Sequence, residues 1–122
     1  MVISTSSHNV HLTDKLCEYI QGALRERFRR FGDHVVSVDA RLEAIDGRRD
    51  RHDIKAIIRV DLRNHRALAT EIVDDSLYAA IRRSATDSAR AVARQLSHSR
   101  QVNGQRPLEK FHALGRYTAA NI

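Results

Sequence analysis

Three consecutive stretches of this chain alternate apolar and polar residues, and this pattern constrains the fold more than any other feature of the sequence. The stretches cover residues 36–44, 54–62 and 66–73, and Val36, Ile54 and Leu68 are among their apolar positions. Successive side chains of a β-strand point to opposite faces of a sheet, so a period of two predicts strands with one buried and one solvated face. Turn signals at residues 46–47 and 64–65 separate the stretches. The sequence therefore predicts three strands connected by turns.

A helix is predicted before these strands. Thr13 is a good N-cap residue, and Gly32 followed by Asp33 is a typical helix end. Between them, apolar residues recur at helical spacing and define one face, with Phe28 beside it. The face consists of Leu16, Ile20, Leu24 and Phe31.

The longest predicted helix follows the strands. Residues 74–76 offer N-caps, and we expect the helix to end near Ser99 or Arg100, because Asn103-Gly104 and Pro107 disfavour helix. Tyr78 is expected at the contact between this helix and the sheet. The apolar face of the helix consists of Leu77, Ile81, Ala85, Ser88, Val92 and Leu96.

A short β-type run at residues 2–7 precedes the first helix, which gives the order β-α-β-β-β-α. The simplest packing is an α+β fold, a four-stranded sheet with two helices packed on one face. We expect one domain over residues 1–100 and a flexible C-terminal tail over residues 101–122. The single cysteine, Cys17, and the lack of a recognisable signal peptide favour the cytoplasm.

Positive charge is concentrated in the C-terminal part of the chain. The formal net charge is +6, and residues 1–75 hold 13 basic and 13 acidic residues, whereas residues 76–122 hold 8 basic and 2 acidic ones. Arginine, which accounts for 18 of the 21 basic residues, offers a planar set of donors that fits phosphate. An anionic partner such as nucleic acid explains this asymmetry. A genome rich in arginine codons explains the composition equally well.

The long helix carries most of this charge on one face. On a helical wheel Arg83, Arg90 and Arg94 lie opposite the apolar face, Arg82 and Arg100 flank them, and Asp87 is the one acidic residue. Solvated helix faces usually mix both signs, so this face indicates contact with a phosphate backbone. The alternative interpretation of this arginine-rich face is an ordinary solvated helix surface. Arg25 and Arg29 of the first helix are weaker candidates, which would complete a groove if the two helices lie side by side.

Catalytic and metal chemistry find little support in the sequence. The pair His8 and His11 lacks the further ligands that a zinc site needs. Cys17 is expected to be a small apolar residue of the first helix rather than a nucleophile. No phosphate-binding loop is present. Most aromatic residues are assigned to the core, so we expect recognition of shaped, phosphate-rich RNA without base readout. The expectation is a protein that is not an enzyme and has no metal or cofactor.

Two strings carry a resemblance to a known family. They are "ISTSSHNVHLTDKLCEYIQGAL" at residues 3–24 and "DDSLYAAIRRSATDSARAVARQL" at residues 74–96. Over residues 2–100 the chain resembles the bacterial ribosome hibernation-promoting factor and ribosome-associated inhibitor family, in its short form. The second string has Ser76 where the family often has Asp, and Ser also caps helices. The tail beyond residue 100 matches neither subtype of the family, so the sequence does not decide whether ribosome pairing is promoted or blocked.

The resemblance implies a stress factor that binds the small ribosomal subunit over its tRNA and mRNA channel and silences translation by occlusion. Its partners would be the subunit and its ribosomal RNA, with no membrane and no small-molecule substrate. RNA contact is carried over, by match to the basic positions of the family's helices, to Arg82, Arg83, Arg90, Arg94 and Arg100 and, more weakly, to Arg25 and Arg29. The alternative is a general structured-RNA-binding protein with a plan like that of double-stranded-RNA-binding domains, which would bind plain duplex RNA.

Overall fold

The computed structural model describes residues 1–46 and 52–105, with the backbone alone at residues 46, 52 and 99–105. The elements follow the order β-α-β-β-β-α, with a 3₁₀ turn after the first helix. They are β1 (Val2–His8), α1 (Asp14–Phe28), η1 (Arg29–His34), β2 (Val35–Asp46), β3 (His52–Leu62), β4 (Leu68–Asp74) and α2 (Leu77–Gln105).

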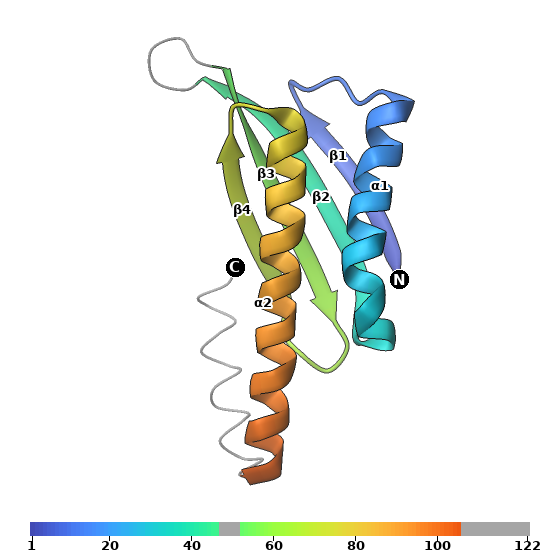
Figure 1. Ribbon diagram of the computed structural model, residues 1–122, viewed down its shortest axis with the longest axis vertical. Coiled ribbons are helices and arrows are strands. Elements are labelled where there is room, and N and C mark those ends of the chain that lie inside the picture. The colour runs from blue at the N-terminus through green and yellow to red at the C-terminus, as the bar shows by residue number, and fades with distance from the viewer. Residues whose placement is uncertain (47–51, 106–122) are drawn as a thin grey trace.

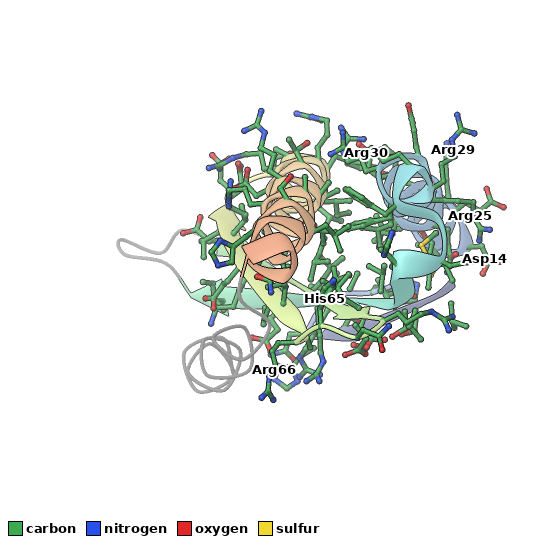
Figure 2. The ribbon with its side chains drawn as sticks, turned by 90° about the horizontal axis from the view of Figure 1, so that it is seen from below. Asp14, Arg25, Arg29, Arg30, His65 and Arg66 are labelled. Carbon is green, nitrogen blue, oxygen red and sulfur yellow. The ribbon has the colours of Figure 1, made fainter. Side chains whose placement is uncertain are left out.

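The strands form one sheet in the order β1-β2-β3-β4 (Figure 1). β1 runs parallel to β2, whereas β2, β3 and β4 pair antiparallel. A parallel pair needs a crossover connection, and α1 provides it. Both helices cover the same face of the sheet and run side by side (Figures 1 and 2). The predicted α+β fold is confirmed.

The core lies between the sheet and the two helices. α1 contributes Leu16, Ile20, Leu24 and Phe28, all buried, while Phe31 in η1 is only partly buried. Phe28 therefore takes the core position that the sequence pattern assigned to Phe31. The helix ends at Phe28, and the tighter 3₁₀ turn then rotates Phe31 out of line with the face of α1. Burying each large apolar side chain contributes roughly 1.5–3 kcal/mol.

The start of β2 departs from simple alternation. The register between β2 and β3 shifts between Val35 and Ser37, as in a β-bulge. Val35 is 2% exposed and Val36 is 46% exposed. The expectation that Val36 lies on the buried face is therefore wrong, because an extra residue in one strand reverses the facing of its neighbours.

α2 buries a stripe of small residues, which brings its backbone close to the sheet. Two of them are serines: Ser84 donates to the carbonyl oxygen of Ile81 at 3.0 Å, and Ser88 donates to that of Ser84 at 2.7 Å. These bonds satisfy the buried hydroxyl groups without a partner from another element. The rest of the stripe consists of Ala80, Ala85 and Ala89, with Val92 and Leu96 beyond them.

The predicted end of α2 is too early. The helix continues past Arg100 and through Asn103 and Gly104 to Gln105. Asn and Gly lower helix stability by at most about 1 kcal/mol each but do not forbid helical backbone. The predicted tail, residues 101–122, thus begins in helix, and its part from residue 106 lies outside the described residues. Within the described ranges, no helix is long and apolar enough to cross a membrane.

Candidate nucleic-acid interface

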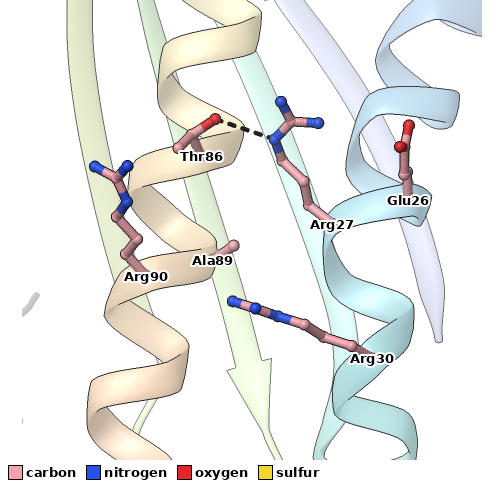
Figure 3. A pocket seen from close by; sticks show the side chains of 6 residues that line it. All are labelled: Glu26, Arg27, Arg30, Thr86, Ala89 and Arg90. Atoms are coloured by element: carbon pink, nitrogen blue, oxygen red, sulfur yellow. Dashed lines mark hydrogen bonds between the residues drawn. The ribbon is translucent and has the colours of Figure 1, made fainter.

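A side-chain bridge joins the two helices on the surface that faces away from the sheet. Arg27 Nε of α1 donates to Thr86 Oγ1 of α2 at 3.1 Å (Figure 3). The Thr86 hydroxyl in turn donates to the carbonyl oxygen of Arg82 at 3.0 Å. The hydroxyl accepts one bond and donates one, so the Arg27 side chain is held across the gap between the helices.

A groove runs along this gap. One hollow, of about 480 Å³, is lined by Glu26, Arg27, Arg30, Thr86, Ala89 and Arg90 (Figure 3). A second, of about 400 Å³, is lined by Arg27, Arg82, Arg83, Thr86, Asp87 and Arg90. The two hollows share three lining residues, so they form one continuous depression. We call it the arginine groove and define it by its basic residues Arg27, Arg30, Arg82, Arg83 and Arg90.

The charge of the arginine groove is strongly unbalanced. Its five arginines are opposed along its lining by two carboxylates, Glu26 and Asp87. Like charges gathered this closely repel one another, and a bound anion relieves that repulsion. Guanidinium groups donate to phosphate oxygens in a bidentate fashion. The arrangement suits a run of phosphate groups along the groove.

One arginine of the groove is already engaged. Arg83 Nη1 lies 2.8 Å from Asp74 Oδ2, at the junction of β4 and α2. The hydrogen bond from Arg83, with that from the backbone N–H of Ser76, lowers the pKa of Asp74 from 3.8 to about 2. Asp74 therefore remains charged at neutral pH and offsets part of the positive charge of Arg83.

The remaining sequence-predicted residues of α2 lie on the same helix with different surroundings. Arg82 and Arg90 line the arginine groove, and Arg94 is exposed one turn beyond Arg90. Arg100 lies in α2, but its side chain is outside the described part of the chain.

The predicted residues of α1 do not line the groove. Arg25 is exposed, donates to Gln21 Oε1 at 3.4 Å and lies on the side of α1 away from α2 (Figure 2). Arg29 is exposed at the start of η1 and points away from the sheet (Figure 2).

Instead, α1 and η1 contribute Arg27 and Arg30, neither of which was predicted from the sequence to contact RNA. Arg30 also lies with its guanidinium 4.7 Å from the ring centroid of Phe31, a cation–π contact that restricts its orientation. The signal for Arg27 is its place four residues after Ala23 and eight after Tyr19, on one flank of the apolar face. The sequence does not reveal that this flank faces α2.

Tyr78 was expected in the core, at the contact between α2 and the sheet, but it lies outside the core. It is 45% exposed, and its ring meets that of Tyr19 edge to face, with centroids 4.8 Å apart and planes at 79°. Ala80 and Ile81 fill the core positions of this turn, so Tyr78 lies on the flank that faces α1. The tyrosine pair therefore spans the two helices near the start of α2.

The described ranges contain no group of three or more His, Cys, Asp or Glu side chains that is arranged to hold a metal ion. Cys17 is half-buried, with Sγ 4.0 Å from Thr5 Oγ1.

Comparisons with known proteins identify the family and the fold of the chain. Residues 3–100 match the model of a family described as "Sigma 54 modulation protein / S30EA ribosomal protein". The Protein Y N-terminal domain from Thermus thermophilus is similar in structure, with a TM-score of 0.65 and 26% identity over 77% of this chain and 98% of that one. A ribosomal subunit interface protein from Coxiella burnetii shares the fold, with a TM-score of 0.68 and 12% identity over 80% and 99% of the two chains. No curated protein sequence matches the chain.

Proposed function

Because the chain belongs to the sigma 54 modulation protein / S30EA ribosomal protein family, we propose that it binds the small ribosomal subunit at the tRNA and mRNA channel and silences translation by occupying it. Proteins of this family are ribosome-associated factors that regulate translation in hibernation. The match confirms the family resemblance inferred from the sequence. The proposal adds to this which ribosomal subunit the protein binds and at which site.

The arginine groove carries the proposal. It is formed by residues from both helices, and the sheet holds those helices in a fixed relation, so the phosphate-binding groups are positioned before RNA arrives. Preorganised contacts lose less conformational entropy on binding than flexible ones. A rigid basic face of this kind fits folded ribosomal RNA, which presents phosphates at fixed spacings.

The proposed action is steric and needs no chemical step. A domain seated in the channel excludes tRNA and mRNA by volume, and arginine–phosphate contacts determine how long it stays. We therefore propose a cytoplasmic protein that is not an enzyme. The RNA-contacting set proposed from the structure and the sequence together is Arg27, Arg30, Arg82, Arg83, Arg90 and Arg94, with Arg100 as a further candidate and Arg25 and Arg29 as peripheral ones.

The test is co-sedimentation of the purified protein with small ribosomal subunits at about 50 and 200 mM salt, with plain duplex RNA as competitor. Five arginine–phosphate contacts predict a log–log salt slope of roughly −3.5 to −4.5, so affinity should fall on the order of a hundredfold or more over this range. Stoichiometric binding that the duplex does not displace supports the proposal. Easy displacement by the duplex would favour the general RNA-binding alternative.

A matched pair of double variants checks the surface. Arg82→Gln with Arg90→Gln removes two charges from the groove and should weaken subunit binding. Arg41→Gln with Arg59→Gln removes two exposed charges on strands β2 and β3, on the sheet face opposite the helices, and should leave binding unchanged. Equal effects of the two pairs would mean that net charge, and not the groove, drives association.

A further inference from the structure

An exposed aromatic side chain stands at one end of the arginine groove. Tyr78 lies in the first turn of α2, and Arg82, which lines the groove, follows it by four residues on the same flank of the helix. Thr86, which holds Arg27 across the gap, follows after another four residues. The tyrosine is therefore in line with Arg82 and Thr86 along α2.

Tyr78 differs from the other exposed apolar side chains of the described residues. Those belong to the N-terminus and the strands: Met1, Val2, Val36 and Val73. A single exposed apolar residue needs no explanation by itself. Tyr78, however, lies one helical turn before Arg82, which lines the arginine groove, and its ring is restrained by edge-to-face contact with Tyr19. A ring held in one orientation loses little entropy when a second ring stacks on it.

We infer that Tyr78 stacks on an unpaired base of an RNA strand whose phosphates occupy the arginine groove. This inference rests on the part of the proposed function that assigns RNA to the groove. Proteins that bind single-stranded nucleic acid combine a basic groove for the backbone with aromatic rings for the bases. Bases in a duplex are already stacked on their neighbours, so a lone ring at the groove end selects unpaired nucleotides. We assign Tyr19, which touches the ring of Tyr78 edge to face, as a positioning residue.

The test measures binding of a fluorescent oligoadenylate and of a mixed-sequence RNA duplex to the wild-type protein and to Tyr78 variants. Tyr78→Leu should weaken oligoadenylate binding roughly 5- to 150-fold, the range for loss of one base–aromatic stack. Its log–log salt slope should stay unchanged, because no cation is removed. Duplex binding should also be unchanged. Tyr78→Phe, which keeps the ring, should bind oligoadenylate within about twofold of the wild type.

A variant with a larger ring keeps the inference testable if Tyr78→Leu fails to fold. Tyr78→Trp enlarges the ring and should bind oligoadenylate at least as tightly as the wild type, with a thermal melt confirming the fold. Unchanged oligoadenylate binding by folded Tyr78→Leu would overturn the inference. So would an equal loss of duplex binding, since that would reflect a general effect on the groove.

Co-sedimentation with small subunits separates this inference from the proposed function. If the wild type sediments with subunits but Tyr78→Leu binds oligoadenylate normally, base stacking is wrong and the ribosomal proposal stands. If ring-dependent oligoadenylate binding occurs without subunit binding, the stacking inference holds and the ribosomal proposal fails.

Discussion

Arg27 of α1 and Thr86 of α2 are joined by a hydrogen bond of 3.1 Å from the guanidinium Nε to the hydroxyl oxygen. This bond uses the Nε–H of Arg27 and leaves its two terminal nitrogens, Nη1 and Nη2, for other partners. It therefore fixes the side chain over the arginine groove without consuming the groups that best match a phosphate. Thr86 bonds to both helices, because it accepts from Arg27 of α1 and its own hydroxyl donates to the carbonyl oxygen of Arg82 in α2.

Replacing Thr86 by valine keeps the shape of the side chain and removes its hydroxyl, which accepts from Arg27 and donates to the carbonyl oxygen of Arg82. We expect Thr86→Val to lower the free energy of unfolding by about 0.5–1.5 kcal/mol for each of these two hydrogen bonds, and to weaken RNA binding because Arg27 loses its fixed position. Urea unfolding and RNA titration measure the two effects. Thr86→Ser retains the hydroxyl and serves as control. If valine and serine behave alike, the bridge does not position Arg27.

A comparison of two arginines of α1 tests which flank of the helix meets RNA. Arg27 faces α2 and lines the groove, whereas Arg25 lies on the other side of α1 (Figure 2). Arg27→Gln should reduce the magnitude of the log–log salt slope of RNA binding by about 0.7–0.9, the value for one lost phosphate contact. Arg25→Gln should leave the slope nearly unchanged. A larger effect of Arg25 would show that RNA lies along the outer flank.

The fold was predictable from the sequence because its signals are periodic and local. Alternation identified β2, β3 and β4, and helical spacing with the Thr13 cap identified α1, where Leu16 N–H donates to Thr13 Oγ1 at 3.1 Å. The bulge at the start of β2 was not predictable, because it arises from pairing with β3 and not from the alternation itself. The extension of α2 was missed since Asn103 and Gly104 weaken a helix without ending it.

The sequence predicted the α2 side of the candidate site but not the α1 side. A helical wheel places residues in rows, so Arg82, Arg83 and Arg90 were assigned to one face of α2 and are found along one groove. Which row of α1 lies opposite them depends on how α1 packs against α2. That packing is set by the Tyr19–Tyr78 contact and the buried side chains of both helices, and it turns Arg27 toward α2.

Two phenylalanines of α1 and η1 give a test of the core. Phe28 is completely buried, while Phe31 is partly buried at the edge of the core. Phe28→Ala should lower the free energy of unfolding by about 3–5 kcal/mol, as for other buried aromatic residues. Phe31→Ala should cost clearly less, because solvent and neighbouring side chains can fill the space. Urea denaturation of both variants measures the difference, and equal losses would contradict the assignment of Phe28 to the centre of the core.

The ion pair between Arg83 and Asp74 makes stability depend on pH in the acid range. The pKa of Asp74 in the folded state is about 2, below its ordinary value of 3.8. Between these values the unfolded chain binds more protons than the folded one, so stability rises with pH. The contribution of Asp74 is complete above about pH 4 and is lost as the pH falls toward 2. Unfolding of the wild type and of Asp74→Asn at several pH values should show a smaller acid dependence in the variant.

The same variant tests how Arg83 is shared between Asp74 and RNA. Asp74→Asn removes the charge that competes with phosphate for Arg83, at 2.8 Å in the free protein. RNA should bind the variant more tightly, and the magnitude of its log–log salt slope should rise by up to about 0.9 if Arg83 gains a full phosphate contact. Arg83→Gln should abolish this gain when it is combined with Asp74→Asn. If the double variant keeps the gain, the effect of Asp74 acts through the general field of the groove and not through Arg83.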